Sequence, residues 1–348
     1  MAPQGFARRV LRWQRAHGRH DLPWQQDRDP YRVWLSEVML QQTQVATVRA
    51  YYARFLERFP DLQRLAAAPL DDVLACWSGL GYYSRARNLH RCAQRLCAEH
   101  GGRFPRSSAA LAQLPGIGRS TAAAIAALCF DEPVAILDGN ARRVLARCLG
   151  WPGDLRRPAE LRRLWLQAQA LVPARAAAAY TQGLMDLGAL VCTARVPGCA
   201  RCPLAPVCVA HAQGQPLAYP LQSPPRARGR RCAGLLWLEQ RDRLWLVQRP
   251  LRGVWAGLWS LPEAPSAAVW RRRLRGWPGE VETLAPIAHA LTHFDWRLEP
   301  LRWRLPPRLG AAQLRALVEQ LPAGRWVDTA QAAQLALPAP VRQLLFAA

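Results

Sequence analysis

Apolar residues recur at helical spacing through the N-terminal part of the chain. Segment 32–48 shows this clearly, with Trp34 and Val38 on recurring positions. Such a period predicts amphipathic helices, and the Ala-rich stretch 120–130, apolar on all sides, is typical of a buried one. Pro or Gly bounds most of these segments, as expected at helix ends. Further helices are expected over residues 61–77, 86–98, 107–114, 140–149 and 173–191.

The pattern changes at residues 214–231, which hold four prolines and four arginines. We interpret this stretch as an extended linker between two domains. Behind it, 232–238 and 244–249 are strand-like and joined by polar residues, which indicates a hairpin. Further strands are expected over 284–291 and 295–305, and helices over 270–274 and 311–321. The fold class is therefore a mostly helical domain over 1–213 and an α+β domain over 232–348.

Length and composition agree with two folded domains. The chain has 348 residues, of which 51% are hydrophobic. That length supports about two domains, each with its own core, and the apolar content excludes a disordered basic tail. The sequence has no run of 18 apolar residues and no apolar segment of the signal-peptide type. We therefore expect an intracellular protein that does not enter a membrane.

The charge is strongly positive, at +23. Residues 1–213 carry 28 Arg against 15 acids, and residues 214–348 carry 19 Arg against nine acids. Such an excess favours a polyanionic partner such as nucleic acid, although solvated arginines of a generally basic proteome would give the same count. The chain contains no lysine, which excludes catalysis through a lysine Schiff base.

Four of the ten cysteines cluster with the spacing C-x6-C-x2-C-x5-C, at Cys192, Cys199, Cys202 and Cys208. Four thiolates can hold a tetrahedral zinc ion or a cubane iron–sulfur cluster. Because zinc ribbons favour two C-x2-C knuckles and this loop has one, a single 4Fe–4S cluster is favoured over zinc, with free thiols third. The others are expected to pack as small apolar residues: Cys76, Cys92, Cys97, Cys129, Cys148 and, in a strand, Cys232.

Two glycines two apart mark the segment L-P-G-I-G-R-S-T at 114–121. Gly116 and Gly118 would let the backbone turn sharply, and its N–H groups could hold a phosphate with the next helix terminus. A plain helix connector would look the same. Beside the basic composition, the segment favours a helix-hairpin-helix that grips DNA. The following segment I-L-D-G-N places Asp138 at a helix start, where an N-cap is the ordinary reason for an aspartate.

Two further segments carry candidate chemistry. Glu37 is the only acid between Asp29 and Glu57. Its apolar neighbours would desolvate the carboxyl and raise its pKa, which suits a general acid. The alternative is an ordinary exposed glutamate. The polar run that follows it, 41–44, could probe a base stack. The segment 80–87, L-G-Y-Y-S-R-A-R, suits a loop pressed on nucleic acid, although its tyrosines could equally belong to a core.

Together these segments closely resemble the MutY-type adenine DNA glycosylases of the helix-hairpin-helix, endonuclease III-like superfamily. The resemblance covers nearly the whole chain and is strongest over 6–210. It implies removal of adenine paired with 8-oxoguanine or guanine in duplex DNA during base excision repair, after the adenine is flipped out. It also implies a monomer that acts on DNA and touches no membrane, in the cytoplasm beside a bacterial nucleoid.

The resemblance also implies roles for single residues. Glu37 protonates the adenine at N7, and Asp138 stabilises the sugar oxocarbenium ion, as the two carboxylates of a glycosidase do. Lyase members carry a lysine where Ser120 stands, so a monofunctional glycosylase without Lys-dependent AP lyase activity is implied. The remaining implied residues are Asn140 as a catalytic support, Gln42, Leu80, Tyr82, Gly116, Gly118 and Arg119 as DNA contacts, and the four clustered cysteines as 4Fe–4S ligands.

The C-terminal domain resembles the nudix-like domain that reads 8-oxoguanine in this family. The recognition sequence Phe-Ser-His appears here as Leu291-Thr292-His293, which keeps the hydroxyl and the imidazole and loses the aromatic ring. Residues 264–279 contain four arginines and no acid, so we expect no divalent metal and no pyrophosphatase activity.

Three other functions remain as alternatives. The first is a thymine or oxidised-pyrimidine glycosylase of the same superfamily. The second is a protein that binds mispairs without chemistry, and the third is a redox-signalling role for the cluster. The joint presence of Glu37 and Asp138 disfavours the second alternative.

Overall fold

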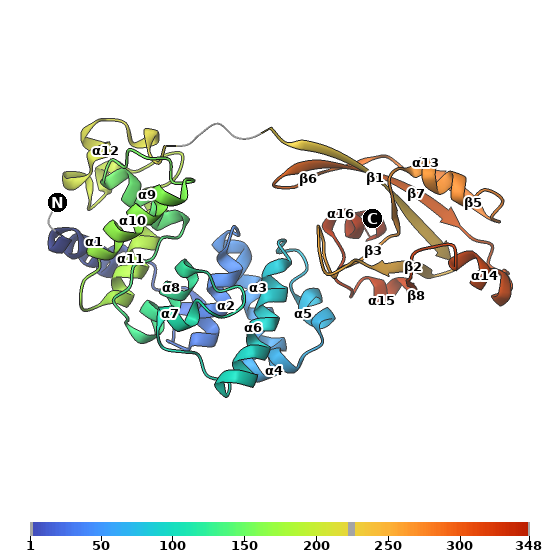
Figure 1. Cartoon of the computed structure of the whole chain (residues 1–348), viewed down its shortest axis with the longest axis horizontal. Helices are drawn as coiled ribbons and strands as arrows, with labels where there is room; N and C mark the ends of the chain where they lie inside the picture. The colour runs from blue at the N-terminus through green and yellow to red at the C-terminus, as the bar shows by residue number, and fades with distance from the viewer. Residues whose placement is uncertain (1–2, 222–226, 347–348) are drawn as a thin grey trace. The chain divides into compact units, whose positions relative to one another are not determined.

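The computed structural model describes residues 3–221 and 227–346, which form two compact units (Figure 1). The first unit comprises Met1–Ala67 and Asn88–Pro224, and the second comprises Ala68–Arg87 and Pro225–Ala348. The segment Ala68–Arg87 therefore groups with residues that follow it by about 150 positions in the chain.

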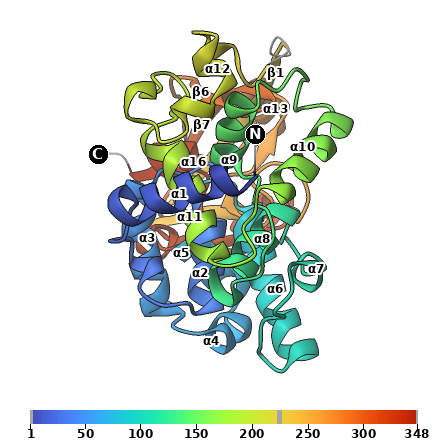
Figure 2. The same cartoon turned by 90° about the vertical axis from the view of Figure 1, so that its left-hand side faces the viewer.

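The first unit is helical, as the sequence predicts. Its helices are α1 (Pro3–His17), α2 (Pro30–Leu40), α3 (Val45–Arg58), α4 (Leu62–Ala67), α6 (Ser84–His100, which begins in the second unit), α7 (Ser108–Leu111), α8 (Arg119–Phe130), α9 (Gly139–Cys148), α10 (Pro158–Ala170), α11 (Ala177–Leu190) and α12 (Val209–Ala212). Helix α11 is the centre of the unit, since α1, α8 and α9 all pack against it (Figure 2). Its apolar side chains, among them Tyr180, Leu184 and Leu187, belong to the main hydrophobic core.

Two predicted helices are interrupted in the structure. The expected helix over 32–48 ends at Leu40 and resumes at Val45, because Gln42 adopts a left-handed backbone conformation with φ 59°. The expected helix over 61–77 is split into α4 and α5 (Leu70–Cys76), since Pro69 supplies no N–H for a continuous ladder. In both cases the helical spacing of apolar residues continues through a turn, so the sequence pattern does not show where the helix ends.

The second unit contains one mixed sheet with flanking helices. Its strands are β1 (Gly229–Gln240), β2 (Arg243–Gln248), β3 (Trp259–Ser260), β4 (Glu263–Ala264), β5 (Glu280–Thr283), β6 (Ile287–Ala290), β7 (Phe294–Arg304) and β8 (Arg325–Asp328). Its helices are α5, α13 (Ala267–Arg273), α14 (Ala311–Val318), α15 (Thr329–Ala332) and α16 (Ala339–Phe346). The main strand order is β3-β2-β1-β7-β5, and β1 and β7 run parallel along most of their length.

Alternating side chains divide the core of the second unit between the two faces of the sheet. Leu235 and Leu298 pack on one face with Leu246 and Trp296. The neighbouring residue in β1, Leu236, belongs to the core of the other face. The parallel register Leu235↔Pro300 and Leu236↔Leu301 keeps this alternation in step across both long strands.

The predicted hairpin after the linker is confirmed. Strands β1 and β2 pair antiparallel with Gln240 opposite Arg243, which leaves Arg241 and Asp242 as the connecting turn. Cys232, expected to pack in the strand, is exposed. Of the six cysteines outside the cluster, Cys92 and Cys148 are fully buried, while Cys76, Cys97 and Cys129 are partly buried.

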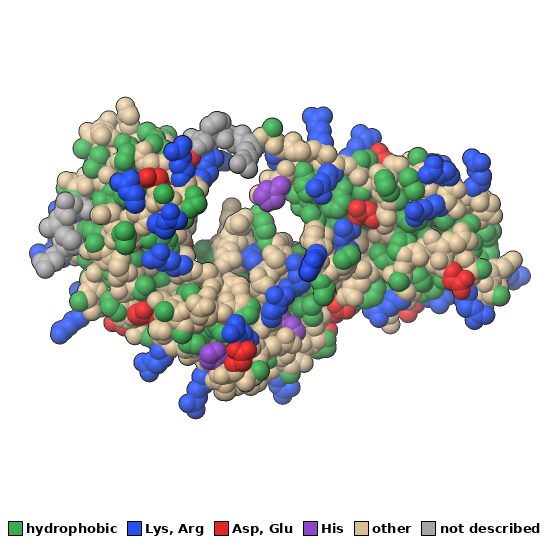
Figure 3. All heavy atoms as spheres, in the orientation of Figure 1, with side chains coloured by type: hydrophobic (Ala, Val, Ile, Leu, Met, Phe, Trp, Pro, Cys, Tyr) green, Lys and Arg blue, Asp and Glu red, His purple; other side chains and the backbone are tan. Residues whose placement is uncertain are grey.

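The predicted linker 214–231 lies partly outside the described residues, which omit 222–226. Its last residues, from Gly229 onward, already belong to β1. Within 3–221 and 227–346, no helix is long and apolar enough to cross a membrane. Arginines are spread over the visible surface of both units and outnumber acidic side chains there (Figure 3).

Candidate active site and nucleic-acid interface

Glu37 lies on α2 among buried neighbours and lines a pocket of about 240 Å³ in the first unit. The pocket wall also includes Arg19, Trp24, Gln25 and Gln182. The side-chain amide of Gln25 is buried, and neither its nitrogen nor its oxygen has a hydrogen-bond partner among the described residues. A buried amide without a partner is costly unless a ligand satisfies it. The pocket is thus suited to a small polar, planar group.

The carboxyl of Glu37 is chemically unusual. Its burial, with a smaller contribution from the negative charge of Asp138, raises its pKa from the ordinary 4.5 to about 7. The direction of this shift is the one expected from the sequence, and the role of Glu37 as the acid stays a prediction. A carboxylic acid that keeps its proton near neutral pH can act as a general acid. The influence of Asp138 also means that the two carboxyl groups lie within electrostatic range of each other.

Asp138 caps the N-terminus of α9. One of its carboxylate oxygens accepts a hydrogen bond from the backbone N–H of Ala141 at 2.7 Å. The side chain is only partly exposed. The other oxygen is not used by this cap, so a structural and a chemical role are compatible in one residue.

Asn140 and Ser120 lie on neighbouring helix starts. The Asn140 side chain accepts a hydrogen bond from Arg143 at 2.8 Å, and Arg143 in turn donates to the backbone carbonyls of Gly188 and Cys192. Gly188 has no side chain, which lets α11 approach Asn140 closely. The Ser120 hydroxyl, in the first turn of α8, is buried and has no hydrogen-bond partner in the described part of the chain.

The glycine hairpin joins α7 to α8. Gly116 adopts φ 76°, and a Cβ there would lie 2.5 Å from Cβ of Asn88, so no other residue fits. Gly118 has an ordinary φ and open space around it. Arg119 is exposed and lays its guanidinium over the ring of Trp165, 4.0 Å from its centroid. The exposed backbone at Gly118, at the start of a twelve-residue helix, is suited to a phosphate.

The turn between α2 and α3 lies beside this hairpin. Gln41 donates from its side-chain amide to the Thr121 hydroxyl at 3.3 Å. Gln42 follows on an exposed turn. The polar run therefore projects from the surface that carries the hairpin, although the sequence had placed it within a helix.

Tyr82 belongs to the second unit. Its φ is 48° and its side chain is 49% exposed, which is uncommon for a large aromatic residue. The guanidinium of Arg85 lies over the rings of Trp77 and Tyr82 and donates to the carbonyls of Leu80 and Gly81. Leu80 itself is 6% exposed, so its side chain packs inside the loop, and its role as a DNA contact stays a prediction.

The residues of the predicted recognition loop connect β6 to β7. Thr292 and His293 are exposed, whereas Leu291 is partly buried and packs against the core of the sheet. The Leu291 carbonyl accepts a hydrogen bond from Arg228 at 2.6 Å. The Thr292 hydroxyl lies 3.5 Å from the Tyr82 hydroxyl. Two exposed groups from distant parts of the chain thus meet at one edge of the second unit.

The four clustered cysteines line one small, apolar-walled cavity in the first unit. Arg147 donates to the Cys192 thiol at 3.3 Å and to nearby backbone carbonyls. Among the described residues, no group of three or more His, Cys, Asp and Glu side chains is arranged to hold a single metal ion. Four thiols that line one shared cavity are the ligand type that an iron–sulfur cluster needs.

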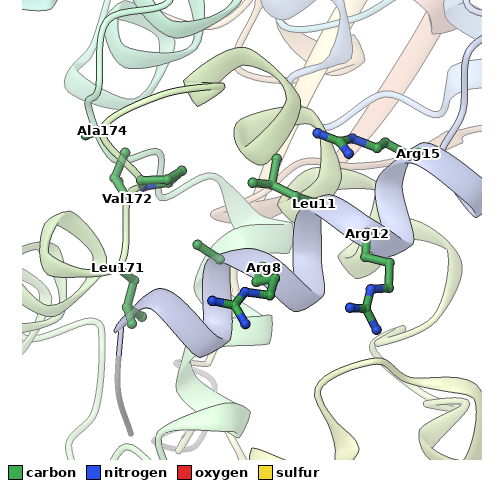
Figure 4. A pocket seen from close by; sticks show the side chains of 9 residues that line it. Arg8, Leu11, Arg12, Arg15, Leu171, Val172 and Ala174 are labelled. Atoms are coloured by element: carbon green, nitrogen blue, oxygen red, sulfur yellow. The ribbon is translucent and has the colours of Figure 1, made fainter.

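In the second unit, α13 carries Arg271, Arg272 and Arg273. A divalent cation needs oxygen ligands, which these side chains do not provide. A separate groove of about 740 Å³ runs along α1 and is lined by Arg8, Arg12 and Arg15 beside Leu171 and Val172 (Figure 4). It includes no carboxylate.

The sequence did not single out Asp186, although it orders the pocket wall. Its fully buried carboxylate accepts hydrogen bonds from the Arg19 side chain at 2.8 Å and from the Gln182 amide at 2.9 Å. One signal was available. Gln182 and Asp186 are spaced i and i+4 within an otherwise apolar helix, where a charged residue is rare unless it is paired.

Comparisons with known proteins agree with this arrangement. Residues 35–167 match the HhH-GPD superfamily of base excision DNA repair proteins, and residues 233–347 match the NUDIX domain family. An adenine DNA glycosylase of Buchnera aphidicola from Acyrthosiphon pisum is 33% identical, over 98% of this chain and 96% of its own. The human adenine DNA glycosylase is 35% identical, over 83% of this chain and 65% of its own.

Solved structures support the helical fold of the first unit. A thermostable thymine-DNA glycosylase is 29% identical, covers 61% of this chain and 97% of its own, and aligns with a TM-score of 0.55. Endonuclease III, in a non-covalent complex with DNA, is 23% identical over 62% of this chain and 98% of its own, with a TM-score of 0.51. With full-length relatives above 30% identity and a matching fold, this chain belongs to the adenine DNA glycosylase family.

Proposed function

We propose that this chain is a monofunctional DNA glycosylase that removes adenine paired with 8-oxoguanine or guanine in duplex DNA. The observation that carries the proposal is the carboxyl of Glu37 in the wall of a pocket, where burial and the charge of Asp138 raise its pKa to about 7. A protonated acid and a second carboxylate are what hydrolysis of a glycosidic bond requires.

The reaction follows from these two groups. Adenine is flipped from the duplex into the pocket, at a cost of a few kcal/mol in stacking and pairing. Glu37 gives its proton to N7 of the base while the bond between C1′ and N9 breaks, and the bonding electrons leave with the adenine. The Asp138 carboxylate stabilises the positive charge on the sugar. Water then adds its oxygen to C1′, and a carboxylate takes up the released proton.

The orientation of Gln182 favours adenine as the base. Asp186 can only accept hydrogen bonds, so the amide nitrogen of Gln182 must face it, at 2.9 Å. The carbonyl oxygen of Gln182 is then the group left for the pocket. An acceptor there is complementary to the exocyclic amine of adenine and repels the carbonyl of a 6-oxopurine.

No lysine is available for strand cleavage. Ser120 occupies the position after the hairpin where lyases carry a lysine, and the chain has no lysine elsewhere. The product is therefore an intact strand with an abasic site. Asn140 and Ser120 would support the reacting sugar.

The four cysteines of the first unit, Cys192, Cys199, Cys202 and Cys208, are proposed to hold one 4Fe–4S cluster. When bound, the cluster would cross-link four points of the loop between α11 and α12. No step of the hydrolysis depends on it. Iron content, absorbance and unfolding before and after chelation would test this assignment.

The DNA contacts are proposed from exposed groups of each unit. Gln42, Gly116, Gly118 and Arg119 of the first unit would hold the backbone and probe the stack, while Tyr82 would insert beside the mispair. Thr292 and His293 of the second unit would read the base opposite adenine. We assign the glycosylase domain to 1–213, the linker to 214–231 and the reading domain to 232–348.

The remaining assignments follow from this role. The protein is proposed to act as a monomer on DNA in the cytoplasm, beside the nucleoid. The reading domain is proposed to lack pyrophosphatase activity, because α13 offers arginines in place of metal-binding carboxylates. Release of a diphosphate product from nucleoside triphosphates in the presence of magnesium would contradict that assignment.

One observation favours a second candidate, a thymine glycosylase, because a solved relative of 29% identity is described as a thymine-DNA glycosylase. The acceptor in the pocket and the second unit, which that smaller protein's match does not cover, argue against it. Excision assays on duplexes with adenine, thymine or oxidised pyrimidines would separate the two substrates.

The deciding experiment is a single-turnover assay on a duplex with adenine opposite 8-oxoguanine, with products separated before and after alkali. A break only after alkali is expected. A break without alkali would contradict monofunctional action, and no break in either lane from protein with an intact cluster would contradict the adenine assignment.

A further inference from the structure

The segment Ala68–Arg87 carries Tyr82 and has directed contacts with the sheet of the second unit near both of its ends. At its beginning, Asp71 in α5 accepts a hydrogen bond from the indole N–H of Trp259 at 3.2 Å and another from the Gln248 amide at 3.1 Å. At its end, Arg87 donates to the Ala256 carbonyl at 2.6 Å. The segment is thus fixed at both ends.

Apolar packing accompanies these contacts. Leu74 is fully buried, and its side chain lies against Gly257 in the loop between β2 and β3. Tyr83 donates from its hydroxyl to the Leu337 carbonyl at 3.3 Å. These residues hold the outline of the segment but contribute no charge, whereas the Asp71 carboxylate accepts the hydrogen bonds that join α5 to Trp259 and Gln248.

Between the two anchors lies a tight turn that Arg85 holds together through the carbonyls of Leu80 and Gly81. Gly79 and Gly81 have φ values of 102° and 70°, and Tyr82 has 48°. Tyr82 is 49% exposed and contacts Thr292 at the edge of the sheet through the two hydroxyls. A permissive backbone can place an exposed aromatic ring in many directions. The two anchored ends and the Arg85 contacts together limit those directions.

We propose that Asp71 is a positioning residue that holds Tyr82 beside Thr292. Tyr82, the wedge that inserts beside the mispair, and Thr292, which reads the base opposite adenine, then contact that base together. This inference rests on the proposed function, since it assigns Asp71 to the discrimination between 8-oxoguanine and guanine. Glu37 and Asp138 lie in the other unit and do not contact the anchor. Loss of Asp71 therefore weakens recognition of the opposite base and spares the chemistry.

The test is affinity of the full protein for two duplexes that carry 2′-fluoro-2′-deoxyadenosine, which resists hydrolysis, opposite either 8-oxoguanine or guanine. We expect Asp71→Asn to weaken binding of the 8-oxoguanine duplex about tenfold, or about 1.4 kcal/mol, with the guanine duplex changed less than twofold. Single-turnover excision of adenine opposite guanine should stay at the wild-type rate. Asp242→Asn, an exposed change in the β1–β2 turn, is the matched control.

Two milder variants guard against misfolding of Asp71→Asn. Gln248→Ala and Trp259→Phe each remove one donor to Asp71 and should each give a part of the same selective loss. A double variant shows whether the loss of affinity in Asp71→Asn depends on Tyr82. In a Tyr82→Leu background, Asp71→Asn should cause no further loss, and 2-aminopurine fluorescence beside 8-oxoguanine should show less unstacking in Asp71→Asn than in wild type.

Equal weakening on both duplexes, no weakening at all, or additive losses with Tyr82→Leu would each overturn the inference. Failure of the proposed function gives a different result, because the wild-type protein would then excise no adenine opposite either base.

Discussion

The amide nitrogen of Gln182 donates to the buried carboxylate of Asp186 at 2.9 Å, and this contact fixes which end of the amide faces the pocket at Glu37. The same carboxylate binds the Arg19 side chain. One buried acid therefore orders two residues of the pocket wall. Because it accepts and never donates, it also decides that the pocket presents an acceptor.

Replacing Asp186 should change both stability and base choice. Asp186→Asn leaves Arg19 without its counter-charge, and we expect the free energy of unfolding to fall by about 3 kcal/mol. It also lets the Gln182 amide turn over, so the preference for excising adenine over hypoxanthine should fall about tenfold. Urea unfolding and excision from duplexes with either base would measure the two effects.

Gln182→Ala separates these effects. It removes the acceptor but keeps the pair of Arg19 and Asp186, so the preference for adenine should fall with a much smaller loss of stability. An unchanged preference in both variants would contradict the role of Gln182 in base choice.

The raised pKa of Glu37 predicts a specific pH dependence. Only the protonated acid can give a proton to the base, so the single-turnover excision rate should fall as pH rises above about 7. Well above that pH, the rate should fall about tenfold for each pH unit. Glu37→Gln should lower the rate at least about 100-fold at every pH. A wild-type rate that is flat between pH 6 and 9 would contradict the assignment of Glu37 as the acid.

The same group affects stability in a direction that can be worked out. The folded protein holds the proton with a pKa of about 7, and the unfolded chain with about 4.5. The stabilisation from this group is therefore fully present below pH 4.5 and is lost as pH rises through 7. Denaturant unfolding at several pH values should show this decline in the wild type and not in Glu37→Gln.

Much of the site could be predicted from local sequence. The apolar neighbours Val38 and Met39 predicted the environment of Glu37, because a carboxylate within an apolar helix loses contact with water when that helix packs into a core. Asp138 at a helix start and the glycines of the hairpin are also local signals. The alternation of apolar residues in 232–249 similarly gave the hairpin and its two strands.

Other features depend on contacts between distant residues. Asp71 resembles any acid in the first turn of a helix, and only the folded chain brings Trp259 and Gln248 to it. The break at Gln42 and the burial of Leu80 were missed because periodicity does not report the backbone conformation of single residues. Cys232, expected in the core, lies on the exposed start of β1, which extends beyond the sheet's buried part.

The two roles of Asp138 can be separated by substitution. Asparagine is as good an N-cap as aspartate, so Asp138→Asn should keep the bond to the Ala141 N–H and unfold at the wild-type denaturant concentration. It has no charge to stabilise the oxocarbenium ion, so single-turnover excision should fall at least about 100-fold. Asp138→Ala should lose activity and also about 1 kcal/mol of stability. Asp138→Asn with wild-type activity would leave the residue as a cap alone.

The two glycines of the hairpin should respond differently to the same change. Gly116→Ala forces a Cβ onto Asn88 at a positive φ, and we expect a loss of about 1–3 kcal/mol in the free energy of unfolding. Gly118 has an ordinary φ and open space, so Gly118→Ala should fold normally. If its backbone contacts a phosphate, the added methyl group should still weaken DNA binding several-fold.

DNA binding measured at several salt concentrations shows whether a variant binds more weakly because it has lost a charged contact with phosphate. Affinity should fall with salt with a log–log slope of about −0.9 for each phosphate neutralised. The methyl group removes no charge, so Gly118→Ala should bind more weakly at every salt concentration with the same slope as the wild type. Arg119→Ala, which does remove a charge, should lower the slope by about one contact if Arg119 leaves Trp165 to bind phosphate. Wild-type affinity in Gly118→Ala would mean that the hairpin is a connector between α7 and α8 and not a phosphate site.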